Sequence, residues 1–565
     1  MRSLIFCALL LETASYLQAQ EPIGAPADST TAAGDVSFSA NAPAVQVVVD
    51  RFRLVGNAAS MEAIPGSAQV IGPAELAARP LLFDDVLRIL TRAPGLNLQE
   101  EDGYGLRPNI GMRGTGSERS EKITLLEDGI LISPAPYAAP AAYYFPVVGR
   151  MQAIEVRKGS SQIKYGPRTT GGALNLVSSA IPGTFTWGVD LAGGGDRTGK
   201  ARVRVGDSYA RGGWMAETYQ LRTDGFKQLD GGGDTGFDVK DYLVKLRVNA
   251  KPAGSVYQAL ELKLGRYDQT SQETYLGLTE ADFRLNADRR YAGSQADVMR
   301  ADQRQIQLRH TLQVGARLDL TTAIYRHDVE RNWYKLASVR GVGIEAIVND
   351  PETHVAELAI VRGGDSGPDA LSVVAGQRAY DARGVQSILG LRLGGPGLAH
   401  DVELGIRFHQ DAEDRFQHAD GYAMEAGRMR LTTSGAPGAN ANRVSEASAW
   451  AFFIQDQIQF GRWTMSPGLR HERIDFTRTD YAAADPTREA PTRVRDNGVE
   501  VWIPGLGLGV TVNESASLFT GVHRGFAPPG PGADRDTEAE ASINVEAGGR
   551  FQRGAWRVQT AVFHN

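Results

Sequence analysis

The chain has 565 residues, of which 22% are charged, and its formal net charge is −6. This length exceeds one ordinary hydrophobic core, so the sequence predicts two or more domains or one very large barrel. The acidic balance, with a pI of about 5.9, gives no support for nucleic-acid binding. The mean hydropathy of −0.27 is that of a soluble protein, but a transmembrane β-barrel has an equally weak signal because apolar and polar residues alternate along its strands.

The N-terminus has the features of a secretory signal. Arg2 precedes an apolar run over residues 4–11, and Leu17-Gln18-Ala19 is a plausible cleavage motif. Residues 1–20 are therefore expected to be a signal peptide. The only cysteine, Cys7, lies in this segment, so the mature chain is expected to contain no disulfide.

A leader and a short β-prone run come next. Residues 21–43 are rich in Ala, Pro, Ser, Thr and Gly, and this composition predicts a flexible leader. The run Val45-Gln46-Val47-Val48-Val49 follows it. An extended segment of this kind can pair through its backbone with a strand of a partner protein and demands little of its side chains. Alternatively, these valines form the first strand of the next domain.

An ordered series of motifs occupies the region up to Pro182. The motifs lie at residues 64–71, 83–90, 110–114, 125–130, 154–159 and 165–177. In this order they resemble the plug domain of TonB-dependent outer-membrane receptors. The resemblance implies that residues 44–50 are the TonB box, that TonB is the partner of the box, and that residues 51–183 are a plug of mixed α and β structure.

From about Trp187 to the end, apolar and polar residues alternate, as in Leu260-Glu261-Leu262-Lys263-Leu264. Alternation in segments of about ten residues is typical of barrel strands, although a soluble sandwich shows the same pattern. The signal peptide and the plug motifs favour a membrane protein. We therefore predict that residues 184–565 form a large transmembrane antiparallel β-barrel, of about 22 strands in the full protein, with the plug in its lumen.

Two barrel stretches and the plug apex favour one branch of the family. Residues 461–470, residues 518–530 and the apex at residues 133–140 resemble the ferric dicitrate receptor branch. The long polar stretches between the strands are predicted to be extracellular loops. These stretches lie at residues 268–300, 331–385, 410–446 and 476–498.

The C-terminal region predicts a truncated barrel. Residues 185–565 are too few for about 22 strands at roughly 25 residues per strand with its connection. The chain stops at Phe563-His564-Asn565, without the terminal aromatic strand typical of the family. An open edge in lipid leaves backbone groups unpaired, so the sequence is expected to lack the last strands. The rival hypothesis, a complete smaller barrel, would have to exclude the plug from its lumen.

A plug–barrel ionic cluster is predicted from the resemblance. Arg113 and Arg157 lie in the plug's two arginine–glycine-like motifs, and Glu546 stands in the matching barrel motif. In the family, plug arginines pair with barrel glutamates. Such a cluster would hold the plug in the lumen, because removal of one partner leaves a buried charge. The alternative is that these residues are solvated charges.

The ligand is expected to bind where the plug apex and the loops converge. The candidates are Tyr137, Tyr143 and Tyr144 of the plug with Arg331, Trp333, Tyr334, Lys335 and Arg340 of the barrel. Ferric citrate and siderophore complexes are usually anionic, and guanidinium groups suit carboxylate oxygens. An alternative places Trp333 and Tyr334 in an aromatic girdle, with the charged side chains facing water.

No catalytic or metal-binding pattern is present in the sequence. The nine histidines show no ligand spacing, and Gly114-Thr115-Gly116 lacks the third glycine of a dinucleotide loop. The prediction is a monomeric importer in outer-membrane lipid, with no catalytic residues and no cofactor. It takes up a ferric chelate with energy from TonB. Uptake of haem, cobalamin, a nickel chelate or a glycan remains an alternative, as does a passive porin or an adhesin.

Overall fold

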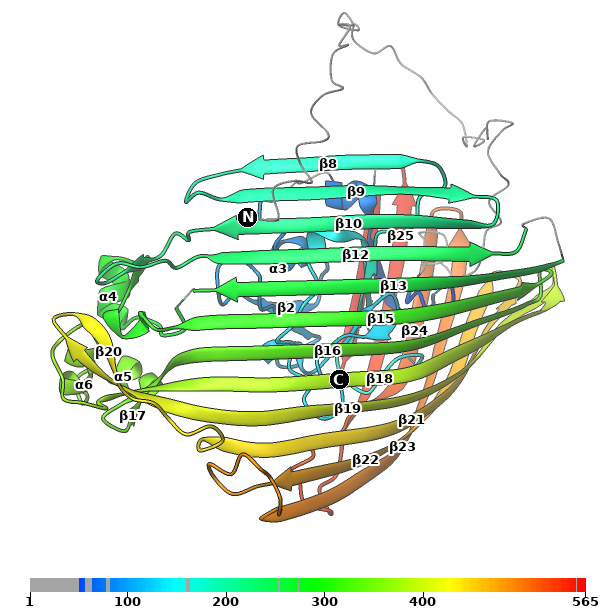
Figure 1. Ribbon diagram of the computed structural model, residues 1–565. Coiled ribbons are helices and arrows are strands. Elements are labelled where there is room, and N and C mark those ends of the chain that lie inside the picture. Colours follow the sequence, from blue (N-terminus) through cyan, green and yellow to red (C-terminus); the bar gives the residue numbers. More distant parts are fainter. Residues whose placement is uncertain are drawn as a thin grey trace, which may run out of the picture. The chain divides into compact units, whose positions relative to one another are not determined.

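The computed structural model describes residues 50–55, 64–77, 82–158, 163–251, 255–272, 274–554 and 556–565. The predicted signal peptide, the leader and Val45-Gln46-Val47-Val48-Val49 lie outside these residues. The described chain consists of a small mixed domain, the plug, followed by a large antiparallel sheet (Figure 1). Of the described helices, none is both long and apolar enough to cross a bilayer.

The plug is built on a five-stranded sheet with the order β1-β6-β7-β4-β5. Its strands are β1 (Ser67–Ile71), β4 (Thr124–Glu127), β5 (Ile130–Leu131), β6 (Met151–Lys158) and β7 (Gly172–Ser178). Strands β4 and β7 pair in parallel, and the other pairs are antiparallel. Nearly every residue of β4, β6 and β7 is buried, as expected for a sheet covered on both faces.

Short elements complete the plug around this sheet. They are α2 (Pro73–Ala77), α3 (Val86–Leu90), the strand pair β2 (Leu96–Gln99) and β3 (Asn109–Met112), and the 3₁₀ turns η2 (Glu118–Ser120) and η3 (Val148–Arg150). Asp85 caps the N-terminus of helix α3, since its carboxylate accepts a hydrogen bond from the Leu87 amide at 2.9 Å. The predicted amphipathic segment 83–90 is therefore helical only from Val86, and it buries Val86, Leu87 and Leu90.

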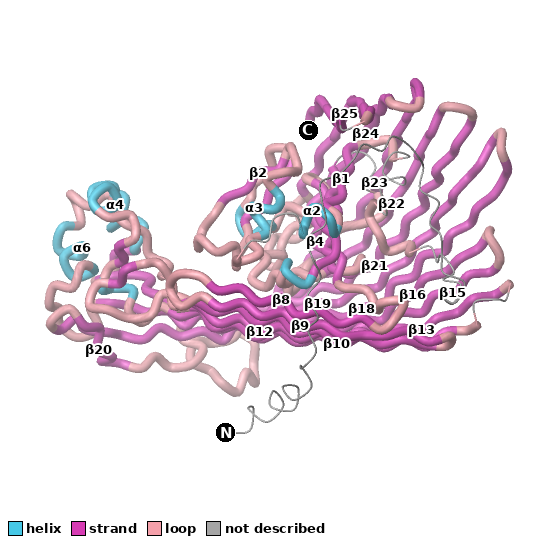
Figure 2. Tube along the Cα trace, turned by 90° about the horizontal axis from the view of Figure 1, so that it is seen from above, coloured by secondary structure: helices cyan, strands magenta, loops and turns pink. Residues whose placement is uncertain are grey.

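Within the described residues, seventeen strands form the barrel sheet around the plug. They are β8 (Thr186–Gly193), β9 (Gly199–Tyr209), β10 (Gly212–Thr223), β12 (Phe237–Asn249), β13 (Val256–Ser271), β15 (Val298–Val314), β16 (Leu318–Val339), β17 (Val342–Gly343), β18 (Leu371–Gly395), β19 (Leu398–Glu425), β20 (Arg428–Thr433), β21 (Ala441–Phe460), β22 (Trp463–Asp480), β23 (Arg493–Asn513), β24 (Ala516–Ala527), β25 (Glu540–Arg553) and β26 (Trp556–His564). Successive strands pair antiparallel, except that the short strands β17 and β20 pair only with β16 and β19, which continue by pairing with β18 and β21. Figure 2 shows these strands curving around the plug elements.

The connections between barrel strands are short at one end and long at the other. Strands β16, β18 and β19 have 22, 25 and 28 residues, whereas about ten suffice to cross a bilayer. The prediction that the stretches 331–385 and 410–446 are irregular loops is therefore wrong in part, because the paired strands continue into both of them. The alternation of apolar and polar residues that identified the strands ends where the strands leave the lipid-facing zone. The hydrogen-bonded pairing of their backbones continues beyond that point.

The long connections contain the helices α4 (Glu280–Leu285), α5 (Ile344–Asn349) and α6 (Val355–Val361), the 3₁₀ turn η4 (Ala292–Ser294) and the parallel strand pair β11 (Gln228–Leu229) and β14 (Arg289–Arg290). Helices α5 and α6 and the turn η4 contribute to a separate apolar cluster. Leu336, Leu371 and Val373 of the extended strands pack against α5 and α6 in this cluster. The long loops are consequently folded against one another (Figure 1).

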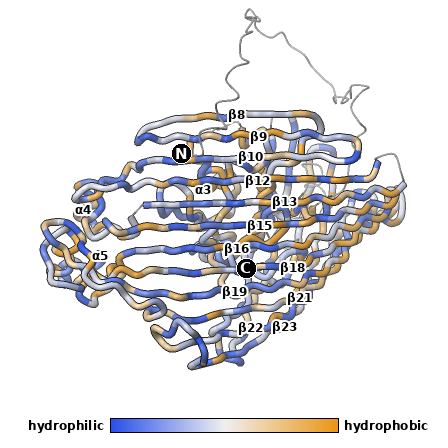
Figure 3. The backbone as a smooth tube through the Cα atoms, viewed as in Figure 1, coloured by the Kyte–Doolittle hydropathy of each residue, from blue (hydrophilic) through white to orange (hydrophobic). Residues whose placement is uncertain are grey.

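The two faces of the barrel sheet differ in polarity. Outward positions carry exposed apolar side chains such as Leu264, Ile306 and Ile324, and the hydrophobic colour is strongest toward the short-turn ends of the strands (Figure 3). Inward positions on the same strands carry buried Lys263, Gln305 and other polar groups that face the plug. This arrangement confirms the prediction of a barrel with an apolar outer face and a polar lumen.

Candidate ligand site and plug contacts

Tyr143, which follows the plug apex at residues 133–140, lies at the centre of a basic cluster on the loop side of the plug. The guanidinium carbon of Arg331 lies 3.8 Å from the centroid of its ring. Those of Arg119 and Arg378 each lie at 5.5 Å. The cation–π contacts of Arg331 and Arg378 connect the plug loop that carries Tyr143 to the barrel strands β16 and β18. The structure therefore brings together the predicted residues Tyr143 and Arg331.

Trp333 extends this cluster along β16. Its ring contacts the guanidinium groups of Arg107 at 5.0 Å and Arg119 at 5.3 Å and the Lys335 ammonium at 4.5 Å. Lys335 also lies 3.2 Å from the ring centroid of Tyr275. Trp333 is 4% exposed and is on the inward face, so it does not belong to a lipid-facing girdle.

The cluster contains more cations than carboxylates. Glu101 pairs with Arg119, Asp102 lies near Arg107 at 3.8 Å, and Glu413 accepts from Arg378 at 2.9 Å. Within the described residues, Arg331 and Lys335 have no carboxylate partner, and the Arg331 Nε and Nη2 atoms are buried without a hydrogen bond. Burial opposes the charge of Arg119, but its hydrogen bonds to Glu101 outweigh this and raise its pKa. The site is accordingly able to accept further negative charge.

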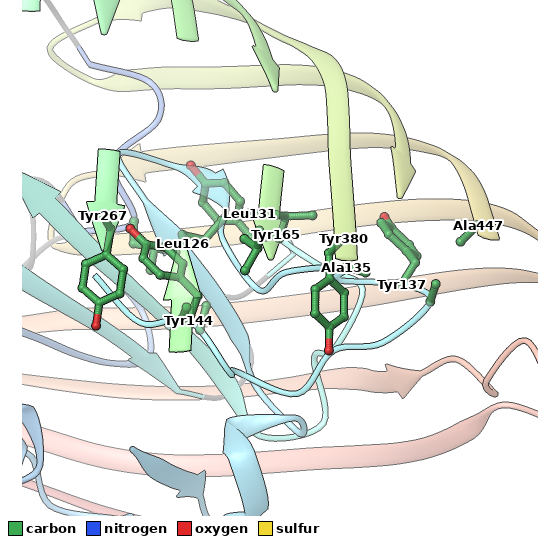
Figure 4. Packing of buried hydrophobic residues seen from close by; sticks show 14 of the residues in the cluster. Leu126, Leu131, Ala135, Tyr137, Tyr144, Tyr165, Tyr267, Tyr380 and Ala447 are labelled. Carbon is green, nitrogen blue, oxygen red and sulfur yellow. The ribbon is translucent and has the colours of Figure 1, made fainter. Parts of the chain in front are cut away.

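Tyr137 is held deeper between plug and barrel. Its amide and that of Ala138 donate to the two carboxylate oxygens of Asp411 at 2.7 and 2.9 Å. Its hydroxyl accepts from Arg407 at 2.7 Å and donates to Glu472 at 3.2 Å. Tyr137 is fully buried (Figure 4), so it fixes the apex of the plug in this state of the molecule.

The other three candidates lie apart from the basic cluster. Tyr144 is buried against Tyr267, with ring centroids 5.2 Å apart (Figure 4). Tyr334 is on the opposite face of β16 from Arg331, where its hydroxyl donates to Asp420 at 2.5 Å. Arg340 is exposed at a tight turn with a φ of 52°.

The predicted ionic cluster is arranged around Glu546. Arg113 of the plug forms an ion pair with Glu546 of β25, and the hydroxyl of Ser67 donates to the same carboxylate at 2.7 Å. Arg157 donates to the backbone oxygen of Leu54 within the plug at 2.7 Å, and burial lowers its pKa to about 10. Arg113 and Glu546 thus form a direct plug–barrel contact.

A second ionic network was not predicted from the sequence. Glu127 at the end of β4 and Asp128 in the turn before β5 accept from Lys263 of β13 at 2.6 and 2.7 Å. Arg150 of the plug bonds to Glu127 at 2.7 Å and to Asp241 of β12 at 2.8 Å. All five groups are buried. The inward parity of Lys263 on its strand was the sequence signal that could have identified it.

A third network holds the first described residues of the plug. Arg51 lies between Asp319 at the start of β16 and Asp401 near the start of β19, at 2.6 and 2.8 Å. Glu403 accepts from Arg51 at 3.2 Å and from Lys164 at 3.0 Å. These strand ends adjoin the short turns, so this network lies at the end of the barrel opposite the basic cluster around Tyr143.

Two family models match the chain. The TonB-dependent receptor-like β-barrel model matches residues 252–565, and the TonB-dependent receptor plug domain matches residues 60–173. No group of three potential metal ligands occurs in the described part of the chain. The matches therefore agree with the two parts seen in the structure.

Several solved structures are similar in fold. The unliganded ferric citrate transporter FecA has a TM-score of 0.71 at 19% identity, covering 91% of this chain and 72% of that one. The siderophore receptor PiuA from Acinetobacter baumannii has a TM-score of 0.67 at 13% identity, covering 91% of this chain and 74% of that one.

One relative is similar in sequence. The vitamin B12 transporter BtuB from Vibrio vulnificus (strain CMCP6) is 25% identical over 243 residues, which are 39% of this chain and only 36% of that relative's length.

Proposed function

The chain belongs to the family of TonB-dependent receptors, and we propose that it imports an anionic ferric chelate, such as ferric citrate or a siderophore complex. Receptors of this family reside in the outer membrane of Gram-negative bacteria and are not enzymes. TonB would supply the energy by pairing with the segment Val45–Val49. Binding at the basic cluster would precede rearrangement of the plug.

The excess of cations around Tyr143 and Trp333 carries this proposal. A carboxylate-rich chelate can accept hydrogen bonds from guanidinium groups and replace the repulsion among them by attraction. Arg331 and Lys335 provide the charge that no described carboxylate neutralises. The ferric citrate and siderophore receptors among the similar structures support the same ligand class.

Uptake of radioactive iron in iron-poor medium tests the proposal. Cells that carry the full-length gene are supplied with iron-55 as ferric citrate and as a panel of siderophore complexes. We expect uptake of at least one chelate, lost on deletion of residues 45–49. A protein that takes up cobalamin or haem but none of the iron chelates would contradict the ligand class, and uptake unaffected by the deletion would indicate a passive pore.

A pair of matched variants locates the site. Arg331→Gln removes a buried guanidinium that lies over the ring of Tyr143, whereas Arg340→Gln removes an exposed one at the turn that follows β16. Loss of a charge-assisted hydrogen bond corresponds to a roughly tenfold higher half-saturating concentration. We expect this increase for Arg331→Gln alone. Equal uptake by both variants would contradict the proposed site but would not contradict the proposed ligand class.

A further inference from the structure

The inner face of β15 carries neutral amides between two groups of cations. Three successive inward positions, here called the amide column, are the buried residues Gln303, Gln305 and Gln307. Above the column, Ala301 is in register with Arg331 of the basic cluster. At its lower end, Gln307 is in register with Lys263 of β13. Because a strand rises about 3.3 Å per residue, the column connects the level of Arg331 to that of Lys263 over roughly 20 Å.

The plug leaves the upper part of the amide column without polar partners. The Nε2 and Oε1 atoms of Gln303 are buried and have no hydrogen-bond partner among the described residues. Tyr144 of the plug packs against Tyr267, which is in register with Gln303, and its own buried hydroxyl is also unpaired within the described chain. Separation of these two rings would leave no buried charge behind. Since buried polar groups are usually hydrogen-bonded, the amides retain the capacity to bind a polar ligand.

Plug oxygen atoms occupy the cations at the lower end of the column. Lys263 donates to Glu127 and Asp128 at 2.6 and 2.7 Å, and the ammonium group of Lys245 lies 3.7 Å from the carboxylate of Asp128. Arg309 donates to the backbone oxygen of Asp128 at 2.6 Å. The three barrel residues, here called the lower cations, are Lys245, Lys263 and Arg309. They converge on a single turn of the plug.

This turn of the plug fills an anion-binding position on the barrel wall. Glu127 is the last residue of β4, which lies within the plug sheet, so a movement of that sheet withdraws both carboxylates. The lower cations belong to β12, β13 and β15 and remain in the wall. Three buried cations without counter-charge would repel each other at high cost. A ligand that bears carboxylates supplies the same kind of oxygen atoms as the plug turn and removes this cost.

We propose that the lower cations form a second binding site for the transported anionic chelate, which reaches them from the basic cluster along the amide column. This inference rests on the proposed function. Neutral amides donate hydrogen bonds to an anion but hold it less tightly than a cation does, and passage requires several sites that each release the ligand again. The carboxylates of the chelate replace Glu127 and Asp128 as the plug moves, so the lower cations stay paired throughout.

A charge-neutral double exchange distinguishes this site from a purely structural network. E127Q/K263Q removes both members of one plug–barrel ion pair and keeps the net charge. R113Q/E546Q does the same at the pair that joins the plug to β25 and is the matched control. Energised cells are supplied with saturating iron-55 citrate, or with the siderophore complex that the wild type imports, and the rate of import is measured. Binding of the same chelate to de-energised cells reports the affinity of the outer site.

We expect E127Q/K263Q to import the chelate roughly tenfold more slowly than R113Q/E546Q does, because the charge-assisted hydrogen bond from Lys263 is lost. Its binding to de-energised cells should equal that of the wild type, since the basic cluster is intact. Equal import by the two double variants would overturn the second site and leave the proposed function standing. If the wild type imports no iron chelate, the proposed function falls and this site falls with it.

Thiol labelling provides a second measurement, which decides if E127Q/K263Q does not reach the outer membrane. The only cysteine, Cys7, lies in the predicted signal peptide, so Gln305→Cys introduces a single thiol into the mature chain. During import, a membrane-impermeant maleimide should label this thiol at least tenfold faster than in de-energised cells. Ala449→Cys, at a buried inward position of β21, should show no such increase. An equal increase at both positions, or none at Gln305→Cys while the chelate is imported, would overturn the path.

Discussion

Arg51 and Asp319 join the start of the plug to the barrel wall through two parallel hydrogen bonds, from Nε to Oδ1 at 2.6 Å and from Nη2 to Oδ2 at 2.9 Å. Asp319 is fully buried and also accepts from Arg392 at 2.9 Å. Tension applied to the predicted TonB box at residues 45–49 would reach Arg51 two residues later. On the path of that tension this pair follows the longer contact of Asp50 with Arg309 of β15 at 3.5 Å, and it is the stronger of the two because it is bidentate.

Replacement of Arg51 by glutamine should release the segment 50–55 from the barrel. Removal of Arg51 leaves the buried carboxylate of Asp319 without its bidentate partner, at a cost of about 3–5 kcal/mol. We expect faster hydrogen exchange of the Phe52 and Leu54 amides, measured by mass spectrometry. Arg88→Gln, which alters a plug arginine that is 60% exposed, should leave this exchange unchanged. The same protection in R51Q as in wild type would contradict a role for the pair as an anchor.

The Glu127 network should loosen in acid. Burial disfavours its carboxylate, but Arg150 and Lys263 overcome this effect and lower the pKa of Glu127 to about 2. Because an unfolded glutamate has a pKa of about 4.3, the network stabilises the plug above that pH, and this contribution is lost as the pH falls toward 2. Limited pepsin digestion of the plug between pH 4.5 and 2 should accelerate accordingly.

The variant Glu127→Gln tests this origin of the acid sensitivity. It should already be digested faster at pH 4.5 and show a flatter dependence on pH, because it lacks the titrating group. Glu118→Gln, at an exposed position, should behave as the wild type does. An unaltered pH profile in E127Q would assign the acid sensitivity to other groups.

The sequence predicted the barrel because alternation with period two follows directly from strand geometry. The same geometry also separates Arg331 from Tyr334, since residues three apart on a strand face opposite sides, and Tyr334 indeed contacts Asp420 away from the basic cluster. The Arg51 network could not be predicted in this way. Arg51 and Asp319 are 268 positions apart, and the register and curvature of many strands decide which barrel carboxylates meet the plug.

The Arg113–Glu546 contact should show strong coupling in a double-mutant cycle. Each single change, Arg113→Met or Glu546→Gln, leaves a buried partner without its counter-charge and should destabilise the attachment of the plug by about 3–5 kcal/mol. The double variant should cost clearly less than the sum of the two, because neither charge remains. Denaturant-dependent exposure of the plug to protease provides the measurement. Additive costs would show that the two residues act independently.

Asp297 should make the loop before β15 sensitive to pH. Its carboxylate, 4% exposed, accepts from the amides of Tyr275 at 3.1 Å and Leu336 at 3.0 Å. Burial raises its pKa to about 7, despite these hydrogen bonds. The closed loop therefore binds a proton more tightly than the open loop, whose Asp pKa is about 3.9. The contribution of Asp297 to the stability of the closed loop is full below that pH and is lost as the pH rises to about 7.

Hydrogen exchange measures this effect. After correction for intrinsic rates, the Tyr275 and Leu336 amides should exchange faster at pH 8 than at pH 5. Asp297→Asn should abolish this difference and the exposed Asp350→Asn should retain it; a pH difference that persists in D297N would contradict the assignment.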